Sequence, residues 1–146
     1  MDGFSVKKLI LASPLIYGKD GSLRFPVCGT VRGDVLFRMA LDPSQSRRIE
    51  PDRIAFPGRL VEAGSAALSV TGDRDAKAPE LLELPAGTYV FAQVRDPPNA
   101  ETLISMIIEV QQEGLWERLS LDDRLYIRYL FEDEQTVTQV FRPVGL

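Results

Sequence analysis

The sequence contains no histidine and a single cysteine, and both deficits narrow the chemistry open to it. Histidine is the commonest general base and the commonest metal ligand. Its absence excludes Ser-His-Asp and Cys-His catalytic machinery and most zinc sites. Cys28 has no partner for an internal disulfide, which fits either a reducing compartment or a fold that needs no disulfide. A cytoplasmic location is expected. With no histidine to activate it, Cys28 is interpreted as a small core residue.

The chain also has no excess of basic residues and no long apolar run. It carries 17 basic and 21 acidic residues, a formal charge of −4, which argues against direct nucleic-acid binding because phosphate binding needs clustered Lys and Arg. The apolar stretch from Leu9 to Tyr17 contains Pro14 and is too short to span a membrane. Its 146 residues, 45% hydrophobic and 26% charged, predict one globular domain with a substantial core.

The first half of the chain, residues 1–78, is predicted to be rich in β-structure. Val35–Leu41 is short enough for a strand, although a helical turn stays open for it. Ser44–Arg53 is interpreted as a solvated loop, or as an anion-contacting patch if its three arginines converge. Gly72–Ala78 is predicted to be an exposed linker to the second half, residues 79–146. The other expected strands are Val6–Leu11, Leu15–Tyr17 and Leu23–Val27 around an Asp20-Gly21 turn, Cys28–Val31, Ile54–Leu60 and Ala66–Val70.

The second half predicts a strand, a helix and a hairpin. Thr88–Arg95 is rich in β-formers and follows a Pro85-Ala86-Gly87 turn. A helix is expected from its N-cap at Asn99 to about Glu113, with Gly114 as the C-terminal cap. Two strands, Leu125–Phe131 and Thr136–Arg142, should follow as a hairpin. The helix is supported by an apolar stripe at helical spacing, Leu103, Ile104, Ile107, Ile108 and Val110.

These elements predict an α+β fold with a mostly antiparallel sheet and one main helix. One helix can cover only one face of such a sheet. The other face must therefore be buried by the first half of the chain, by a ligand or by a partner.

Motifs for catalysis are scarce. The sequence has no phosphate-binding loop, nucleophile elbow or cysteine pair. The acidic clusters Asp122-Asp123 and Glu132-Asp133-Glu134 are interpreted as solvated turns. A carboxylate-dependent hydrolase, which stays an alternative, would need two acids from separate segments facing one cleft. We therefore expect no enzymatic activity, no cofactor and no metal site.

Aromatic residues and one arginine form the candidate ligand-binding site. Tyr89 and Phe91 share one face of a strand, Trp116 follows the helix, and Tyr126 lies on the next strand. Each is most simply a core or edge residue, but together they could line a pocket for an apolar or aromatic molecule. Arg128 lies in mid-strand and either faces solvent or, if it faces inward, must be paired or bind an anion.

The segment Leu84–Phe91 (LPAGTYVF) resembles the opening of the second repeat in the gyrase-inhibitor-like family. That family includes the effector-binding domains of bacterial multidrug-sensing transcription activators. The resemblance continues in order through an amphipathic helix, Leu125–Leu130 and Val140–Val144, and covers residues 80–144. It implies two strand-helix-strand-strand repeats arranged around a pocket for bulky, often cationic, organic molecules.

The sequence departs from that family at two points. The first half shows no clear helix, and the position of the family's ligand-contacting glutamate holds Ile127, or Arg128 if the register moves by one. A neutral or anionic ligand would suit Arg128 better than a cation. The predicted function is non-enzymatic binding of a small organic molecule. The domain would act as a sensor through a partner regulator. Because no helix-turn-helix segment is visible, a regulatory role would require a partner protein or a lost domain. A partner protein or a homo-oligomer is the expected assembly. The alternative is a protein-interaction module that docks a partner on an exposed sheet face or edge.

Overall fold

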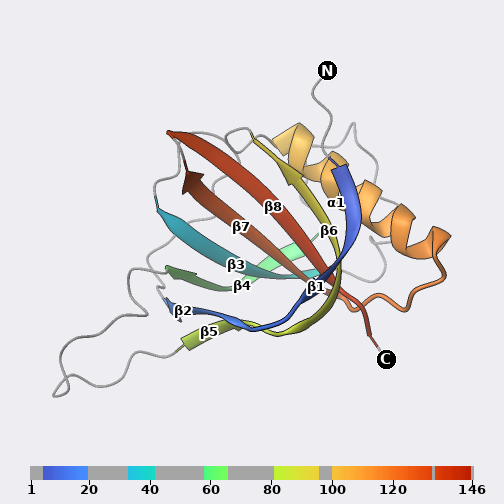
Figure 1. Ribbon diagram of the computed structural model, residues 1–146, viewed down its shortest axis with the longest axis horizontal. Coiled ribbons are helices and arrows are strands. Elements are labelled where there is room, and N and C mark those ends of the chain that lie inside the picture. The colour runs from blue at the N-terminus through green and yellow to red at the C-terminus, as the bar shows by residue number, and fades with distance from the viewer. Residues whose placement is uncertain are drawn as a thin grey trace, which may run out of the picture.

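The computed structural model describes residues 5–19, 33–41, 58–65, 81–95, 100–132 and 134–145. These residues form one antiparallel sheet of eight strands and one helix, α1 (Ala100–Trp116), so the coarse α+β prediction is confirmed, with the sheet dominant (Figure 1). The strands are β1 (Ser5–Leu11), β2 (Leu15–Lys19), β3 (Asp34–Leu41), β4 (Gly58–Ser65), β5 (Leu81–Leu84), β6 (Gly87–Val94), β7 (Arg124–Glu132) and β8 (Gln135–Pro143).

The sheet is strongly curled because its two edges are joined by short connections. The strand order is β1-β6-β8-β7-β3-β4-β2-β5, so β1 pairs with β6 at one edge and β2 pairs with β5 at the other. Leu11 pairs with Gly87 and, a few residues away, Leu15 pairs with Leu84. Both edges must therefore lie close together (Figure 1). Gly87 makes the bend with a φ of 149°, a conformation that side chains rarely adopt.

The helix covers the outer face of this curl. Its apolar stripe is buried against the sheet, as the helical spacing predicts, with Leu103, Ile107 and Val110 almost fully inaccessible to solvent. Opposite them lie alternate residues of the central strands, which is the pattern of a sheet buried on that face. The sheet residues of this core include Val35, Phe37, Val90, Ala92, Leu125, Ile127, Tyr129 and Val140.

The helix ends later than predicted and by a different device. It continues past Gly114 to Trp116, and Arg118 carries the left-handed backbone with a φ of 58°. The Leu119 amide donates to the Gly114 carbonyl at 2.8 Å, and the Arg118 amide donates to the Leu115 carbonyl at 3.1 Å. This is the paired hydrogen-bond pattern of a Schellman cap. Gly114 is therefore no cap but a close-packing position, where a Cβ would meet the Leu121 side chain at 2.6 Å.

The inner face of the curl has a second core that both halves of the chain build. Because strands far apart in the sheet order contribute to it, this face is enclosed by the curl. The first half thus covers the face that the helix leaves open, one of the possibilities that the sequence predicts. Its buried residues are Tyr17, Leu36, Leu82, Leu84, Tyr89, Phe91, Tyr126 and Phe141.

Other strand predictions hold with shifted bounds. β1, β3, β6, β7 and β8 match expected strands within about two residues at each end, and the two ends of the predicted hairpin meet at the Glu132–Gln135 pair. β4 extends from Gly58 to Ser65, beyond the predicted end at Leu60, and β5 has no counterpart among the predictions. The predictions outside the described residues are the Asp20-Gly21 turn, Leu23–Val27, Cys28–Val31, Ser44–Arg53, the first part of Ile54–Leu60, Ala66–Val70, Gly72–Ala78 and the Asn99 cap.

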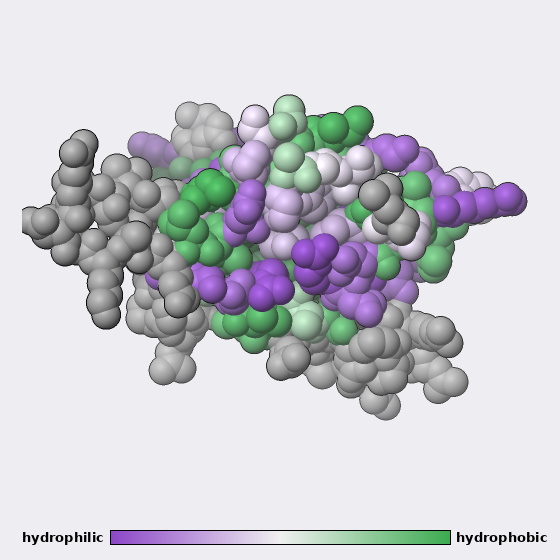
Figure 2. All heavy atoms as spheres, turned by 90° about the horizontal axis from the view of Figure 1, so that it is seen from below, coloured by the Kyte–Doolittle hydropathy of each residue, from purple (hydrophilic) through white to green (hydrophobic). Residues whose placement is uncertain are grey.

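The surface seen from below the view of Figure 1 is chemically mixed. Hydrophilic residues gather across its middle, and apolar residues border them (Figure 2). Within the described residues, no helix combines the length and the apolar composition that crossing a membrane would need.

Candidate functional site

The structure brings together four of the five predicted site residues. Tyr89 and Phe91 on β6 and Tyr126 on β7 belong to the inner-face core. Arg128 lies on the same face as Tyr126, two residues along the same strand, because side chains of a strand alternate. Trp116 lies apart from them: it is the last residue of α1, on the outer face, and is 84% exposed.

The aromatic residues pack against one another. The Tyr89 ring lies edge-on to Tyr126, with 6.5 Å between centroids, and to Phe141 at 5.8 Å. Phe91 lies 4.9 Å from Phe141 in a tilted arrangement. Edge-on pairs at these distances are favourable beyond the burial of their area. Phe141 was missed as a site residue, although it faces Tyr126 directly in the β7–β8 hairpin.

The sequence allowed Arg128 either to face solvent or to face inward with a partner. In the structure it faces inward and is paired. Its Nε and Nη2 donate to the two carboxylate oxygens of Asp34 on β3, at 2.9 and 2.6 Å. Asp34 lies 94 residues away in sequence and was not a candidate. Such a bidentate contact satisfies the guanidinium charge, so Arg128 already has an anionic partner within the chain.

This ion pair is the centre of a polar network across the inner face. Tyr17 donates its hydroxyl to Asp34 at 2.8 Å, and Arg128 Nη1 donates to Gln139 Oε1 at 3.3 Å. Gln139 in turn donates to the side chain of Gln93 at 2.7 Å. Burial raises the pKa of Tyr17 well above its usual value, so its hydroxyl stays protonated and remains a donor. The network ties β2, β3, β7, β8 and β6 together, which is a structural role.

A second polar group lies at the end of the inner face where β7 begins. Arg38 on β3 pairs in register with Tyr126, and the next same-face position of β7 is Arg124. Arg38 Nε donates to Glu62 at 3.0 Å, and Lys19 lies 2.7 Å from the same carboxylate. The hydrogen bonds from Lys19 and Arg38 hold the pKa of Glu62 below its usual range, and the one from Lys19 has the larger effect.

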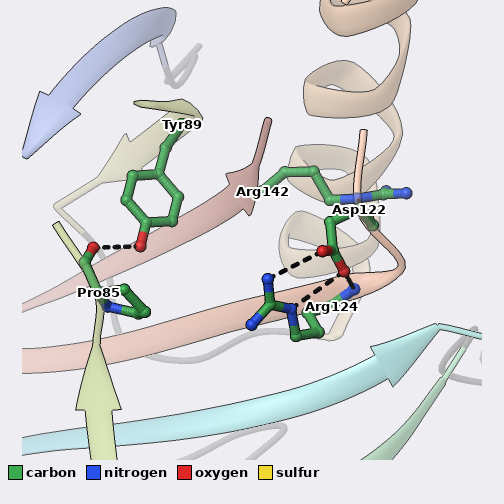
Figure 3. Close-up of polar contacts among 5 residues, drawn as sticks. All are labelled: Pro85, Tyr89, Asp122, Arg124 and Arg142. Atoms are coloured by element: carbon green, nitrogen blue, oxygen red, sulfur yellow. Dashed lines mark hydrogen bonds and ion pairs between the residues drawn. The ribbon is translucent and has the colours of Figure 1, made fainter. Parts of the chain in front are cut away.

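Arg124 is held by an acidic neighbour in a fixed orientation (Figure 3). Its Nε and Nη2 donate to the Asp122 carboxylate at 3.1 and 2.9 Å, and its backbone amide donates to the same group at 2.8 Å. The hydrogen bonds from Arg124 lower the pKa of Asp122, so the carboxylate is ionised at neutral pH. The third guanidinium nitrogen of Arg124 points away from Asp122 (Figure 3).

Two tyrosine hydroxyls complete this end of the face. Tyr89 donates to the Pro85 carbonyl at 2.5 Å (Figure 3). Burial raises the pKa of Tyr89 to about 12 and also raises that of Tyr126, while the nearby positive charge of Arg124 offsets part of both shifts. We call Arg38, Tyr89, Arg124 and Tyr126 the arginine–tyrosine site.

The arginine–tyrosine site is suited to hydrogen bonding and to holding negative charge. The guanidinium groups of Arg38 and Arg124 can donate to an anionic or polar group. The Tyr89 hydroxyl already donates to Pro85, and both tyrosines are only 2% exposed, so their rings lie beside the arginines as part of the inner-face core. Among the described residues, no cluster of three or more acidic or cysteine side chains is arranged to hold a metal ion. The sequence contained a hint of this site in the spacing of Arg124, Tyr126 and Arg128, which alternate on one face of a strand.

Comparison with known proteins adds no relatives: neither the models of known protein families nor the curated proteins contain a match to this chain. The likeness to the gyrase-inhibitor-like family stays a hypothesis drawn from the sequence.

Proposed function

We propose that this chain is a non-enzymatic binding domain for a small organic molecule that carries a neutral or negatively charged polar group. The observation that supports it is the arginine–tyrosine site on the inner face of the curl. There Arg124, whose side chain is 47% exposed, is held in one orientation beside the phenols of Tyr89 and Tyr126. A fixed, accessible guanidinium recognises planar anionic groups with little further loss of side-chain freedom.

Arg124, rather than the predicted Arg128, is the residue placed to contact an anion. Asp34 accepts from Nε and Nη2 of Arg128 and Gln139 accepts from Nη1, so an incoming anion would have to displace a bidentate carboxylate or an amide oxygen. Arg124 is more exposed, and its third nitrogen points away from Asp122. Arg38 on the neighbouring strand adds a second positive charge. A lipophilic cation is disfavoured at this position by both guanidinium groups.

The family resemblance supports the same class of function. If it holds, the domain acts as a sensor whose output passes through a partner regulator or a second copy. The ligand's polar group would contact Arg124, the exposed member of the arginine–tyrosine site.

A thermal-shift screen tests the proposal, with matched sets of small aromatic carboxylates, phosphates, neutral amides and amines. A ligand at ~100 times its Kd adds about 2.7 kcal/mol to the folded state, which is readily measured. For any hit, Arg124→Gln should weaken binding about tenfold, as expected for a partly exposed charge-assisted contact.

Arg95→Gln is the control variant, since it removes the same charge from an exposed residue just past the end of β6, near the β7–β8 hairpin turn. It should leave the affinity unchanged. The proposal fails if no anionic or neutral compound raises the melting temperature, or if Arg124→Gln and Arg95→Gln have equal effects on binding.

A protein-interaction module is the second candidate, because two consecutive residues at the end of α1 expose large apolar side chains. Leu115 is 63% exposed and Trp116 is 84% exposed. Exposed tryptophan is enriched among residues that dominate binding energy at interfaces. Trp116→Ala should abolish such an interaction and leave ligand-induced thermal shifts unchanged, which separates the two functions.

A further inference from the structure

Asp122 lies between two arginines that belong to opposite faces of the sheet (Figure 3). Arg124 shares its face with Tyr126, in the inner core. Arg142 shares its face with Val140, in the core beneath the helix. Asp122 stands where the chain enters β7 and contacts both, so it joins the two faces at this end of the sheet.

The backbone of Asp122 is clamped by two consecutive residues of β8. Its amide donates to the Pro143 carbonyl at 3.0 Å, and its carbonyl accepts a hydrogen bond from Arg142 Nε. With the backbone fixed on both sides, the direction in which the Asp122 side chain leaves the backbone is also fixed. That direction gives the bidentate contact with Arg124.

Arg142 is an unusual residue for this position. Only 4% of it is exposed, and its Nη1 has no hydrogen-bond partner among the described residues. Burial lowers its pKa, and the charges of Asp123 and Asp122 offset this only in part. A buried arginine whose described hydrogen bond is to a carbonyl is weak as a stabilising device, because desolvation of the charge is costly. Its geometry is better explained by what it holds in place.

We propose that Arg142 is a positioning residue for the arginine–tyrosine site: it fixes the Asp122 backbone, and Asp122 in turn fixes the guanidinium of Arg124. The purpose of this arrangement rests on the proposed function, because a fixed guanidinium matters for recognising a ligand. The mechanical link itself does not depend on any ligand and can be measured in the free protein.

The test observes the Arg124 side chain directly by ¹⁵N NMR of arginine Nε–H groups, with Arg124→Lys to assign the signal. In the unmodified protein the Arg124 Nε–H should exchange slowly with solvent, because it donates to Asp122. Arg142→Met keeps an apolar chain of similar length but removes the guanidinium. We expect it to accelerate Arg124 Nε–H exchange about tenfold or to broaden the signal beyond detection, while backbone amide signals of β3 and β7 keep their positions.

Two further variants keep the test decisive. Asp122→Asn should release Arg124 but preserve the slow exchange of the Arg142 Nε–H, because the Asp122 carbonyl remains. Should Arg142→Met fail to fold, Arg142→Lys decides, since an ammonium cannot occupy the Nε position and should still speed the exchange at Arg124. An unchanged Arg124 Nε–H exchange rate in a folded Arg142 variant overturns the inference. A failed ligand screen, by contrast, would overturn the proposed function and leave this link intact.

Discussion

The ion pair between Asp34 and Arg128 should be the most consequential polar contact on the inner face. Removing Asp34 leaves the Arg128 guanidinium without its carboxylate and the Tyr17 hydroxyl without its acceptor. Breaking a fully buried pair costs about 3–5 kcal/mol. Here the two side chains are 18% and 23% exposed, so solvent recovers part of that cost, and we expect about 2–3 kcal/mol for Asp34→Ala.

The pair can be separated from its partners by a double-mutant cycle. Arg128→Met keeps a long apolar chain and removes the charge, and the double variant Asp34→Ala/Arg128→Met leaves no charge behind. Because a buried pair replaced by apolar groups is often tolerated, the double variant should be more stable than the sum of the single effects predicts. We expect a coupling of at least about 1 kcal/mol, which is typical of residues in one network.

Urea denaturation followed by circular dichroism measures each free energy of unfolding. Arg95→Met, at an exposed position, is the control and should change stability by less than about 0.5 kcal/mol. If Asp34→Ala and Arg128→Met add within about 0.5 kcal/mol, the two side chains do not interact in solution, and the inward orientation of Arg128 is wrong.

Three other perturbations have defined outcomes. Burial raises the pKa of all four tyrosines above the ordinary 10.0, that of Tyr89 to about 12. Stability should therefore be lost as pH rises above 10, and absorbance at 295 nm should show tyrosine ionising only together with unfolding. Hydrogen bonds lower the pKa values of Glu62 and Asp122 below their ordinary 4.5 and 3.8. The ionised carboxylates therefore stabilise the fold above those pH values, and this stability is lost as pH falls through the pKa values of the folded state. In urea titrations, Glu62→Gln should make the free energy of unfolding depend less on pH in this acidic range. Ile107, fully buried under the sheet, should not tolerate Ile107→Asp, and a soluble variant with an unchanged melting temperature would contradict the packing of α1.

The helix and the terminal hairpin were predictable because their determinants are local. The stripe from Leu103 to Val110 repeats at the period of a helix, and Leu125–Phe131 and Thr136–Arg142 carry β-formers on both sides of a polar turn. Even so, the end of the helix was misjudged. Glycine is the usual residue at a left-handed helix cap, so the sequence predicts the cap at Gly114. In the structure Arg118 adopts the left-handed conformation instead, and Gly114 leaves room for the Leu121 side chain.

The closure of the sheet could not be predicted from local sequence patterns. It depends on pairing Leu11 with Gly87 and Leu15 with Leu84, contacts between segments about 70 residues apart in sequence. A short strand such as β5 has only four residues and little pattern of its own, so its existence follows from its partner. The acidic partner of Arg128 was missed for the same reason, since β3 lies beside β7 only in the folded sheet.

The candidate site was predicted in part, and the omissions share a physical cause. The site residues predicted from the sequence include aromatic and charged residues in the middle of strands, such as Phe91 and Arg128. In a curled sheet these positions have neighbours on both sides and across the enclosed face, so their side chains become core or find a partner within the chain. A residue at the start of a strand has fewer neighbours. Arg124, the first residue of β7, keeps 47% of its side chain exposed while Asp122 orients it. In an enclosed sheet of this kind, a side chain that must contact a ligand belongs at the end of a strand, where it can be held in one orientation and still be exposed to solvent.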